Sequence, residues 1–525
     1  MPAWSRSCAT WELRSLGWSR RLAVLASALL TASAAAVPET IDANAVVIAT
    51  EPGQFVELGD YLFAGPLTVR NGPDGLGVTE TLSIDDYLLG IREVPFAWPM
   101  EALKAQAVAA RTYLAYTLAS GRTRTGRAYG YDICATTACQ VYAGRRGLDT
   151  ADGLRWQAAV AATAGEVLLY EGRPIQALYS STAGVRTRES EDIFPGLNAP
   201  YLGAVPSPGE DSPFVEWSFA VTETEMEALL AAEGLLAGPL RSIGVTTTPD
   251  GGGPWQVIVQ SGTSIQSFGT YQFRSEINRA AAAVMPDRLP AERPDGRRYP
   301  QTVLSGTYQI VERPVVTEQD GYRVLGREFL FSGSGWGHQV GMSQFGAKAM
   351  ADRGALYGDI LAHYYGGLRP EAGGGWLPDQ VTVGLQIGVD QVLVRAPDGA
   401  AVSADGVTLA NGIAVWRFSP GDGVTASIPA GIGSAPEIRA RLPYRSDGYH
   451  LVFHLTAPAE VQIGATLDNA PLEPIDLGLV EAGFYDYRLE ELWPGAEYGR
   501  LRVTVVGASP HGDYETTLVR VPERR

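Results

Sequence analysis

Glu93 is the residue whose setting in the sequence best suits acid–base chemistry. It lies in a run at 90–95, just ahead of a segment that opens with Trp98 and Pro99 and is predicted to be a helix. Apolar neighbours disfavour the charged form of a carboxyl, and a glutamate in such a setting keeps its proton for general-acid work. The alternative is a surface glutamate that pairs with Arg92 or is stabilised near the helix N-terminus. The apolar neighbours are Ile91, Val94, Phe96 and Trp98.

Other catalytic patterns are missing from the sequence. It contains no Gly-x-Ser-x-Gly elbow, no His-Glu-x-x-His pair and no glycine-rich phosphate loop with a lysine. These gaps argue against an esterase of that type, a zinc peptidase and a nucleotide-binding enzyme. His450 and His454 would share one face of a strand, where a pair of metal ligands is conceivable, but we interpret their spacing as incidental. The sequence predicts no metal and no cofactor.

The N-terminus is predicted to be a signal peptide at 1–36. Arg20 and Arg21 precede an apolar run at 22–30, and small residues at 34–36 supply a cleavage site. The apolar run is short for a membrane span. We therefore expect a secreted, extracytoplasmic protein. The alternative is an uncleaved anchor, which would be its only contact with a membrane.

Cys134 and Cys139 are predicted to form a disulfide. The chain has three cysteines, and Cys8 would leave with the signal peptide. A close pair in an exported chain favours a disulfide, because the compartment is oxidising. Zinc bound by Cys134 and Cys139 is a disfavoured alternative, since no histidine lies between them. Two free thiols are the third possibility.

Length and charge limit the remaining choices. With 525 residues the chain is expected to form roughly two to four domains. Its formal net charge is −17, which repels phosphate backbones. We predict no nucleic-acid partner.

The alternation of apolar and polar residues predicts both helices and strands. Short strands are expected over 44–84. A long helix is predicted over 100–119, because the segment is rich in good helix formers and its apolar residues at helical spacing should face a core. Further helices are predicted at 155–164, 223–232 and 347–365. Strands are expected at 166–170, 175–179 and 255–260. Beyond 374, alternating apolar and polar residues with frequent Gly and Pro predict short strands.

Two blocks of sequence resemble those of the stage II sporulation protein D and amidase-enhancer family. The first covers 87–113 and includes EVP at 93–95, followed by WPMEALKAQAVAARTY. The second is SGSGWGHQVGMSQFGA at 332–347. The segments CQVY at 139–142, YSSTAG at 179–184 and HYY at 363–365 are also similar to elements of that family. The resemblance spans roughly residues 45 to 370.

Together these observations predict an α+β multidomain protein. The mixed α/β core at 44–370 carries the resemblance and includes a subdomain at about 215–310. A small β domain is expected at 375–435, and 439–525 has the strand rhythm of an immunoglobulin- or fibronectin-like sandwich.

The resemblance implies a fold and a cell-wall substrate. For the sporulation branch it implies a lytic transglycosylase that uses the glutamate at the position of Glu93. That residue would protonate the oxygen between N-acetylmuramic acid (MurNAc) and N-acetylglucosamine (GlcNAc), and then deprotonate the muramic 6-hydroxyl to close a 1,6-anhydro ring. For the other branch it implies a non-catalytic, wall-binding enhancer of an N-acetylmuramoyl-L-alanine amidase. The expected partners are peptidoglycan glycan strands and, in the second case, an amidase.

Long polar side chains in the similar blocks are candidates for binding the sugars. Lys104 and Arg111 could instead be solvated on the helix, and the serines could only hold their loop. The sequence departs from the family pattern at Gln339 and Val185, where many members have glycine, and at Ala138, where some have histidine. The last change removes a possible zinc ligand. The candidate residues are Lys104, Gln106, Arg111, Gln140, Ser180, Ser181, His338 and Gln344.

Overall fold

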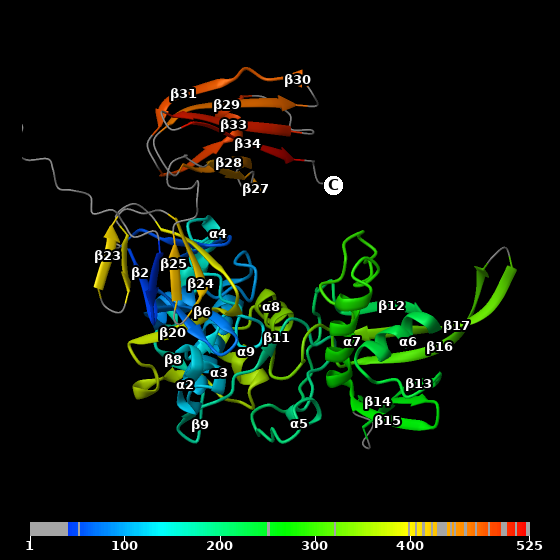
Figure 1. Ribbon diagram of the computed structural model, residues 1–525. Helices are drawn as coiled ribbons and strands as arrows, with labels where there is room; N and C mark the ends of the chain where they lie inside the picture. The colour runs from blue at the N-terminus through cyan, green and yellow to red at the C-terminus, as the bar shows by residue number, and fades with distance from the viewer. Residues whose placement is uncertain are drawn as a thin grey trace, which may run out of the picture. The chain divides into compact units, whose positions relative to one another are not determined.

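The computed structural model describes residues 40–50, 53–248, 253–319, 322–396 and, with short gaps, 400–520. The predicted signal peptide at 1–36 and Cys8 lie outside the described residues. The described residues belong to one unit of the chain, 40–525. Mixed helices and sheets with a β-rich C-terminal part confirm the predicted α+β class (Figure 1).

Two sheets form the β part of the core. The first has the order β23-β22-β2-β5-β6-β20-β7 and is antiparallel except for the β20–β7 pair. The second, β1-β25-β24-β21-β3-β4, is antiparallel throughout. Alternating burial in β2, where Val46 and Ile48 are fully buried, explains why 44–84 reads as strands. The strands are β1 Thr40–Ala43, β2 Ala45–Ala49, β3 Val56–Leu58, β4 Tyr61–Phe63, β5 Leu67–Gly72, β6 Gly75–Ser83, β7 Ile133–Cys134, β20 Gln380–Val389, β21 Val392–Arg395, β22 Ala401–Ala404, β23 Val407–Asn411, β24 Val415–Pro420 and β25 Val424–Ser427.

These pairings correct the prediction of a separate small β domain at 375–435. β20 pairs along its length with β6, and β22 pairs with β2. β25 pairs with β1, so strands from this segment complete sheets that begin at residue 40. Figure 1 shows the yellow strands of this segment among the blue N-terminal ones. The sequence pattern identified the strands, but pairing between distant segments leaves no local signal.

A long buried helix, α2 Met100–Ser120, is the centre of the helical part. It begins after Pro99, which suits the start of a helix because no backbone N–H is lost there. Leu103, Ala107 and Leu114 are fully buried, as their spacing predicts. Helices α4, α8 and α9 contact α2. The remaining helices here and their short strands are α1 Ile84–Leu89, α3 Arg124–Tyr129, α4 Ala151–Ala162, α5 Ser190–Ile193, α8 Gln344–Asp352, α9 Tyr357–Tyr364, η1 Gly374–Trp376, β8 Glu166–Val167, β9 Leu169–Tyr170, β10 Arg173–Pro174, β11 Tyr179–Ser180, β18 Met342–Ser343 and β19 Glu371–Ala372.

The predicted helix at 347–365 is two helices, α8 and α9. Gly354 lies between them with φ +89°, a conformation that glycine adopts without strain and that ends a helix. In place of the strand predicted at 175–179, the structure has the two-residue strand β11, which begins at Tyr179 and pairs in parallel with β18. That pair brings the 179–184 segment against the 332–347 block.

A second hydrophobic core lies in the segment 216–334, which we call the insertion. Its sheet β12-β17-β16, its hairpins β13-β14-β15 and its helices α6 and α7 share one cluster of buried residues. The predicted boundary at about 310 falls short, because β16 and β17 form a hairpin that returns to pair with β12. The elements are β12 Glu216–Thr222, α6 Glu223–Ala232, β13 Leu240–Thr247, β14 Pro254–Ser261, β15 Ser264–Gly269, α7 Thr270–Val284, β16 Tyr308–Gln319 and β17 Tyr322–Ser334.

The C-terminal part consists of two sheets that share one core. Leu451 and Phe453 of β28 cluster with Ile463 of β29 and Val505 of β33. Two sheets around one apolar layer make a β-sandwich, in line with the strand rhythm predicted for 439–525; an immunoglobulin or fibronectin topology stays a prediction. The elements are β26 Ile438–Arg441, β27 Tyr444–Arg445, β28 Gly448–Leu455, β29 Ala459–Leu467, β30 Ala470–Pro471, β31 Ile475–Val480, β32 Gly483–Arg488, α10 Leu489–Leu492, β33 Leu501–Ser509 and β34 Gly512–Arg520.

Truncation tests the shared sheets. A chain ending at residue 370 lacks β20 and its neighbours, which leaves the edge of β6 and a large apolar surface unpaired. We expect it to be insoluble or to lack a cooperative unfolding transition, whereas a chain ending at 436 keeps one. Circular dichroism during urea unfolding measures both, and a cooperative transition in the shorter chain would contradict the shared-sheet architecture.

Candidate active site

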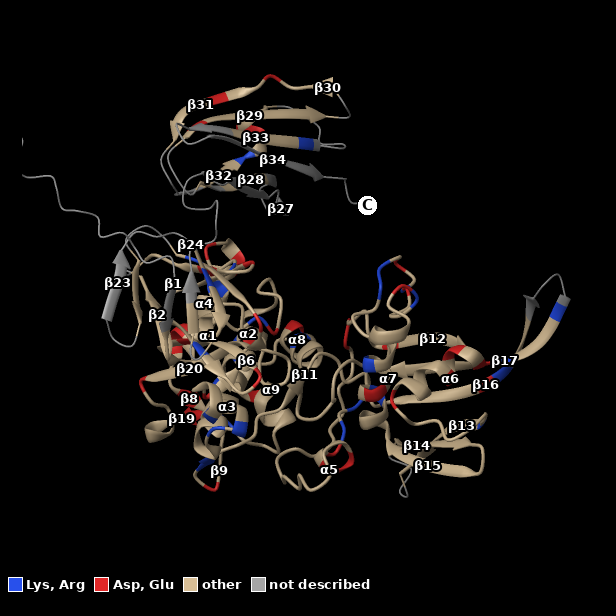
Figure 2. Ribbon diagram, viewed as in Figure 1, with Lys and Arg blue, Asp and Glu red and all other residues tan. Residues whose placement is uncertain are grey.

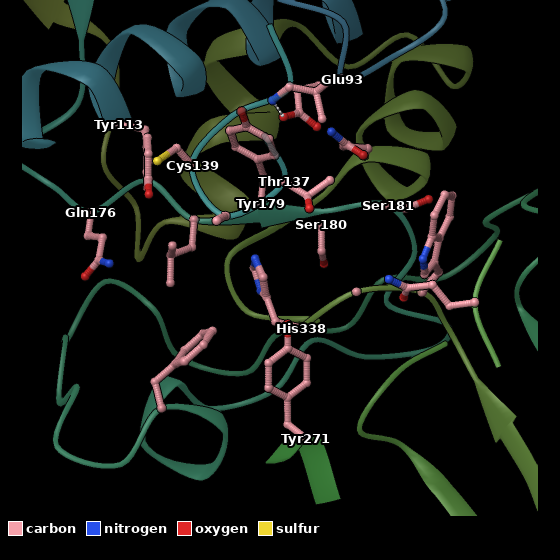
Figure 3. A pocket seen from close by; sticks show the side chains of 18 of the residues that line it. Glu93, Tyr113, Thr137, Cys139, Gln176, Tyr179, Ser180, Ser181, Tyr271 and His338 are labelled. Atoms are coloured by element: carbon pink, nitrogen blue, oxygen red, sulfur yellow. Dashed lines mark hydrogen bonds between the residues drawn. The ribbon is translucent and has the colours of Figure 1, made fainter. Parts of the chain in front are cut away.

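A cavity of about 780 Å³ is lined both by the helical core and by the insertion. Figure 3 shows Glu93 on one side of it and Tyr271 on the opposite side, with His338 pointing in between. The cavity size is that of a site for a small molecule or a short stretch of polymer. Its polar lining residues are Arg92, Glu93, Tyr113, Thr137, Gln176, Tyr179, Ser180, Ser181, Tyr271, Arg274, Gln301, His338 and Gln344.

Glu93 is a half-buried carboxyl in the loop between α1 and α2. Its Oε1 accepts a hydrogen bond from the backbone N–H of Val141 at 2.6 Å. Burial, the largest effect, raises the pKa of Glu93 above its usual range, while hydrogen bonds with the backbone of Val141 and with the side chains of Gln344 and Tyr179 oppose that rise. The raised pKa is the behaviour expected of a general acid rather than of a surface glutamate paired with Arg92.

The loop that carries Val141 is fixed on both sides. The predicted disulfide between Cys134 and Cys139 is present and closes a short loop just before it. Arg92 N–H donates to Val141 O at 2.9 Å, so the two loops run side by side. Gly90 permits this approach, because a Cβ there would lie 2.1 Å from the ring of Tyr142.

Glu80 is a second buried carboxyl, but it lies outside the cavity. It accepts hydrogen bonds from the hydroxyl of Tyr142 at 2.6 Å and from Gly65 N–H at 2.8 Å. Burial raises the pKa of Glu80 to about 7. Its contacts assign it to holding Tyr142, and through that ring the loop of Glu93.

A chain of hydrogen bonds between uncharged side chains leads from the neighbourhood of Glu93 into the core. Tyr179 donates its hydroxyl proton to Gln140 Oε1 at 2.6 Å, and Gln140 Nε2 donates to the hydroxyl of Tyr87 at 2.9 Å. Gln140 is almost fully buried. These bonds orient Tyr179, whose side chain also hydrogen-bonds Glu93.

His338 is held as a neutral imidazole. Its Nδ1 accepts a hydrogen bond from Val340 N–H at 3.1 Å, and the ring also hydrogen-bonds the backbone at Tyr179. Burial, with a smaller contribution from the nearby charge of Arg274, lowers the pKa of His338 to about 4. With Nδ1 accepting, the proton of the neutral ring is on Nε2.

Gln339 shows how the chain accommodates a residue other than glycine at this position. Its φ of +63° lies in the left-handed region. The side-chain amide donates to Ala183 O at 2.9 Å and Ser334 O at 3.1 Å, and accepts from the hydroxyl of Thr307 at 2.6 Å. These three bonds tie the Trp336–His338 loop to the 179–184 segment and to the insertion. Val185, the other departure, is exposed.

The structure brings half of the predicted sugar-binding residues to the cavity. Ser180, Ser181, His338 and Gln344 line it together with Glu93. Ser180 also accepts a hydrogen bond from Gln339 N–H at 3.1 Å, so it holds the loop as well.

The other four residues lie outside the cavity lining, which corrects their assignment as direct contacts. Lys104 pairs with Glu101 at 2.7 Å. Arg111 is fully buried rather than solvated, with its guanidinium donating to the carbonyls of Val160 and Glu166. Gln140 holds Tyr179, and Gln106 Oε1 accepts from Gln344 Nε2 at 3.3 Å. Gln106 and Gln140 therefore position residues of the site.

Several lining residues were missed by the sequence argument. Tyr179 lies in a segment that resembles the family, but a tyrosine beside serines has an ordinary core interpretation. Tyr271, Arg274 and Gln301 belong to the insertion, and only folding brings them to the cavity.

The described residues contain neither a cluster of metal-ligating side chains nor a helix suited to cross a membrane. No group of three or more His, Cys, Asp or Glu side chains in that part of the chain is arranged to hold a metal ion. Within the same residues, no helix has the length and apolar character needed to cross a membrane.

Sequence comparison places this site within a known group of proteins. The Stage II sporulation protein family matches residues 73–170, which include Glu93 and Val141. An uncharacterized protein of Brachyspira hyodysenteriae is 30% identical over 62% of this chain and 75% of its own length. The Stage II sporulation protein D of Bacillus subtilis is 25% identical over 62% of this chain and 85% of its own length. The Amidase enhancer of Bacillus subtilis is 29% identical over 52% of this chain, but the match covers 38% of that protein.

Gln339→Gly tests whether side-chain bonds outweigh backbone strain. Glycine relieves a left-handed φ but removes three buried side-chain hydrogen bonds, each worth about 0.5–1.5 kcal/mol net. Ser334 O and the hydroxyl of Thr307 keep their bonds with Ser305 and Arg188, so the full penalty of an unpaired group does not apply to them. We expect a net loss of stability of roughly 1–3 kcal/mol in urea unfolding. Asparagine tolerates the same φ, but its side chain is one methylene shorter and cannot reach the same partners, so Gln339→Asn should also lose stability. A gain of stability in both variants would show that backbone strain outweighs the side-chain hydrogen bonds.

The pH dependence of stability tests the state of His338. Since the folded pKa is lowered from 6.5 to about 4, the unfolded chain binds the proton more tightly. The native state therefore loses stability as the pH falls from about 6.5 toward 4. Urea unfolding at pH 7 and pH 5 should show a steeper loss for the unmodified protein than for His338→Gln, and equal slopes would refute the assignment.

Proposed function

The chain belongs to the stage II sporulation protein D family, and on that basis we propose that it is a secreted peptidoglycan lytic transglycosylase with Glu93 as its catalytic acid. The proposed substrate is the glycan strand of the wall, and the bond cleaved joins MurNAc to GlcNAc. The N-terminal signal-like sequence supports export.

One observation carries the proposal: Glu93 is the sole carboxylic acid among the described residues that line the cavity. Glycosidases that use water normally need two carboxylates, either about 5–5.5 Å or about 6.5–9.5 Å apart. A single carboxyl suffices when the substrate provides its own nucleophile. The 6-hydroxyl of MurNAc is such a nucleophile.

The reaction needs one proton transferred from Glu93 to the glycosidic oxygen and one returned to Glu93 from the 6-hydroxyl. The protonated carboxyl of Glu93 donates its proton to the glycosidic oxygen, the bond from C1 of MurNAc breaks, and GlcNAc leaves with a free 4-hydroxyl. The carboxylate of Glu93 then takes the proton of the 6-hydroxyl as its oxygen bonds to C1. The 1,6-anhydro ring forms, and Glu93 regains its proton for the next cycle.

Burial of Glu93 serves the first of these steps. Because its pKa is raised, a larger fraction of the protein carries the proton near neutral pH. Tyr179 and Gln140, which hydrogen-bond each other beside the carboxyl, are uncharged. They therefore add no positive charge that would favour the ionised form of Glu93. His338 and the serines would contact the sugar from the other side of the cavity.

A non-catalytic role is the second candidate, supported by the similarity to a protein named Amidase enhancer. In that case the same cavity would bind glycan and the partner would be a wall amidase. The two candidates differ in products, because an enhancer makes no glycan fragments by itself.

Mass spectrometry of the products from peptide-free glycan strands tests the proposal. The mature protein should yield fragments with anhydro-muramic ends, and Glu93→Gln should lower the rate by about 10²–10⁴-fold while still binding strands. The rate should fall as the pH rises through the raised pKa of Glu93, because the acid must be protonated.

Glu371→Gln is the matched control for this test. Glu371 is an exposed glutamate on β19, outside the cavity, and the same substitution there should leave the rate unchanged. Reducing ends in place of anhydro ends would mean that water attacks. Strand binding without any product would favour the amidase-enhancer role.

A further inference from the structure

Arg274 is a buried cation on the wall of the cavity that belongs to the insertion. It lies in the first turns of α7, where its residue is 8% exposed, and its side chain lines the cavity. Its charge contributes to the lowered pKa of His338, so the two groups lie close together. The described mechanism makes no use of this guanidinium.

The partners of Arg274 are neutral. Its Nε donates to Leu304 O at 3.0 Å, its Nη2 donates to the side-chain oxygen of Gln301, and the guanidinium lies 4.9 Å from the ring centre of Tyr271. No Asp or Glu among the described residues forms an ion pair with it or influences its pKa. Burial lowers the pKa of Arg274, as expected for a charge that is removed from water.

A buried charge without an opposite charge is unfavourable, and proteins usually pair it. Arg111 and Arg188 show what structural arginines do in this chain. Arg111 is sealed away from the cavity by carbonyl groups, and Arg188 has Asp192 at 3.6 Å. Arg274 is different, because it is buried yet borders open space.

The charge of the cavity departs from that of the chain. Its charged lining residues are Arg92, Arg274 and Glu93, so the lining is positive whenever Glu93 carries its proton. The chain as a whole carries −17, and Figure 2 shows Asp and Glu interspersed with Lys and Arg along the described elements. A positive cavity in an acidic protein favours an anionic ligand.

We propose that Arg274, positioned by Gln301 and Tyr271, binds a carboxylate carried by the muramic acid residue of the substrate. The inference rests on the proposed function, because it takes the ligand to be a glycan strand. Of the two sugars in the strand, only MurNAc carries a carboxyl, on its lactyl group. That carboxylate is free when the stem peptide is absent; when the peptide is present, the available carboxylates lie further out along it.

A planar guanidinium suits this task. It can offer two parallel N–H groups to a carboxylate, which gives direction as well as charge. The contacts to Leu304 and Gln301 fix the plane of the guanidinium before any ligand arrives. Arg274 is therefore assigned as a specificity-determining residue that recognises a substituent, with Glu93 doing the chemistry.

Binding measurements on Glu93→Gln protein test the proposal without requiring turnover. Four tetrasaccharide probes are titrated by calorimetry: peptide-free alternating GlcNAc–MurNAc, the same compound with its carboxyls reduced to alcohols, the same compound carrying a dipeptide on each lactyl group, and chitotetraose. We expect one carboxylate-bearing probe to bind about 10-fold or more tightly than the reduced compound. Which of the two binds tightly identifies the source of the carboxylate.

Arg274→Gln should remove that preference and leave the affinity for the reduced compound unchanged. Arg279→Gln is the matched control, since Arg279 is an exposed residue of the same helix that pairs with Glu233 at 2.7 Å. If Arg274→Gln does not fold, the comparison of acid with alcohol on the parent protein still decides, together with its weakening in salt.

Two outcomes would overturn the proposal, and they can be told apart. Equal affinity for the acid, peptide and reduced probes would refute the role of Arg274 while leaving glycan binding intact. Failure to bind all four probes would refute the proposed function and this inference with it.

Discussion

The hydrogen bond from Val141 N–H to Glu93 is the contact around which the site is organised. A carboxyl removed from water must find partners, and charged partners would hold it ionised. One backbone donor at 2.6 Å, with neutral side chains beside it, holds the carboxyl in place without that effect. The disulfide, the close approach at Gly90 and the anchoring of Tyr142 by Glu80 all keep that donor in position.

The residues behind the site explain why two distant blocks of sequence resemble the same family. Tyr179 pairs with Met342 through β11 and β18, and Trp98 packs edge-on against Phe345 at 4.9 Å. Gln106 on α2 accepts from Gln344 of α8. The two blocks therefore form one structure, with the first supplying Glu93 and the second supplying His338 and Gln344 to the same cavity.

The sequence predicted those features that have local causes. The helix predicted at 223–232 is present, and Thr222 and Glu225 form a capping box at its start. Glu93 was singled out by its apolar neighbours in the chain and by the resemblance of its block to the family. The roles of Lys104 and Arg111 could not be read from spacing, since α2 is buried on nearly all sides. The pairing of 380–427 with 40–83 and the arrival of Arg274 at the cavity depend on contacts between distant segments, which leave no local pattern.

The insertion has a hydrophobic core of its own, yet it lends three side chains to the cavity. A wall with independent packing can change its sequence without disturbing the loop that carries the acid. In such an arrangement, the loop that carries Glu93 and the facing wall of the cavity are set by different parts of the chain. The wall supplied by the insertion can therefore vary by itself, whereas the loop of Glu93 depends on contacts within the helical core.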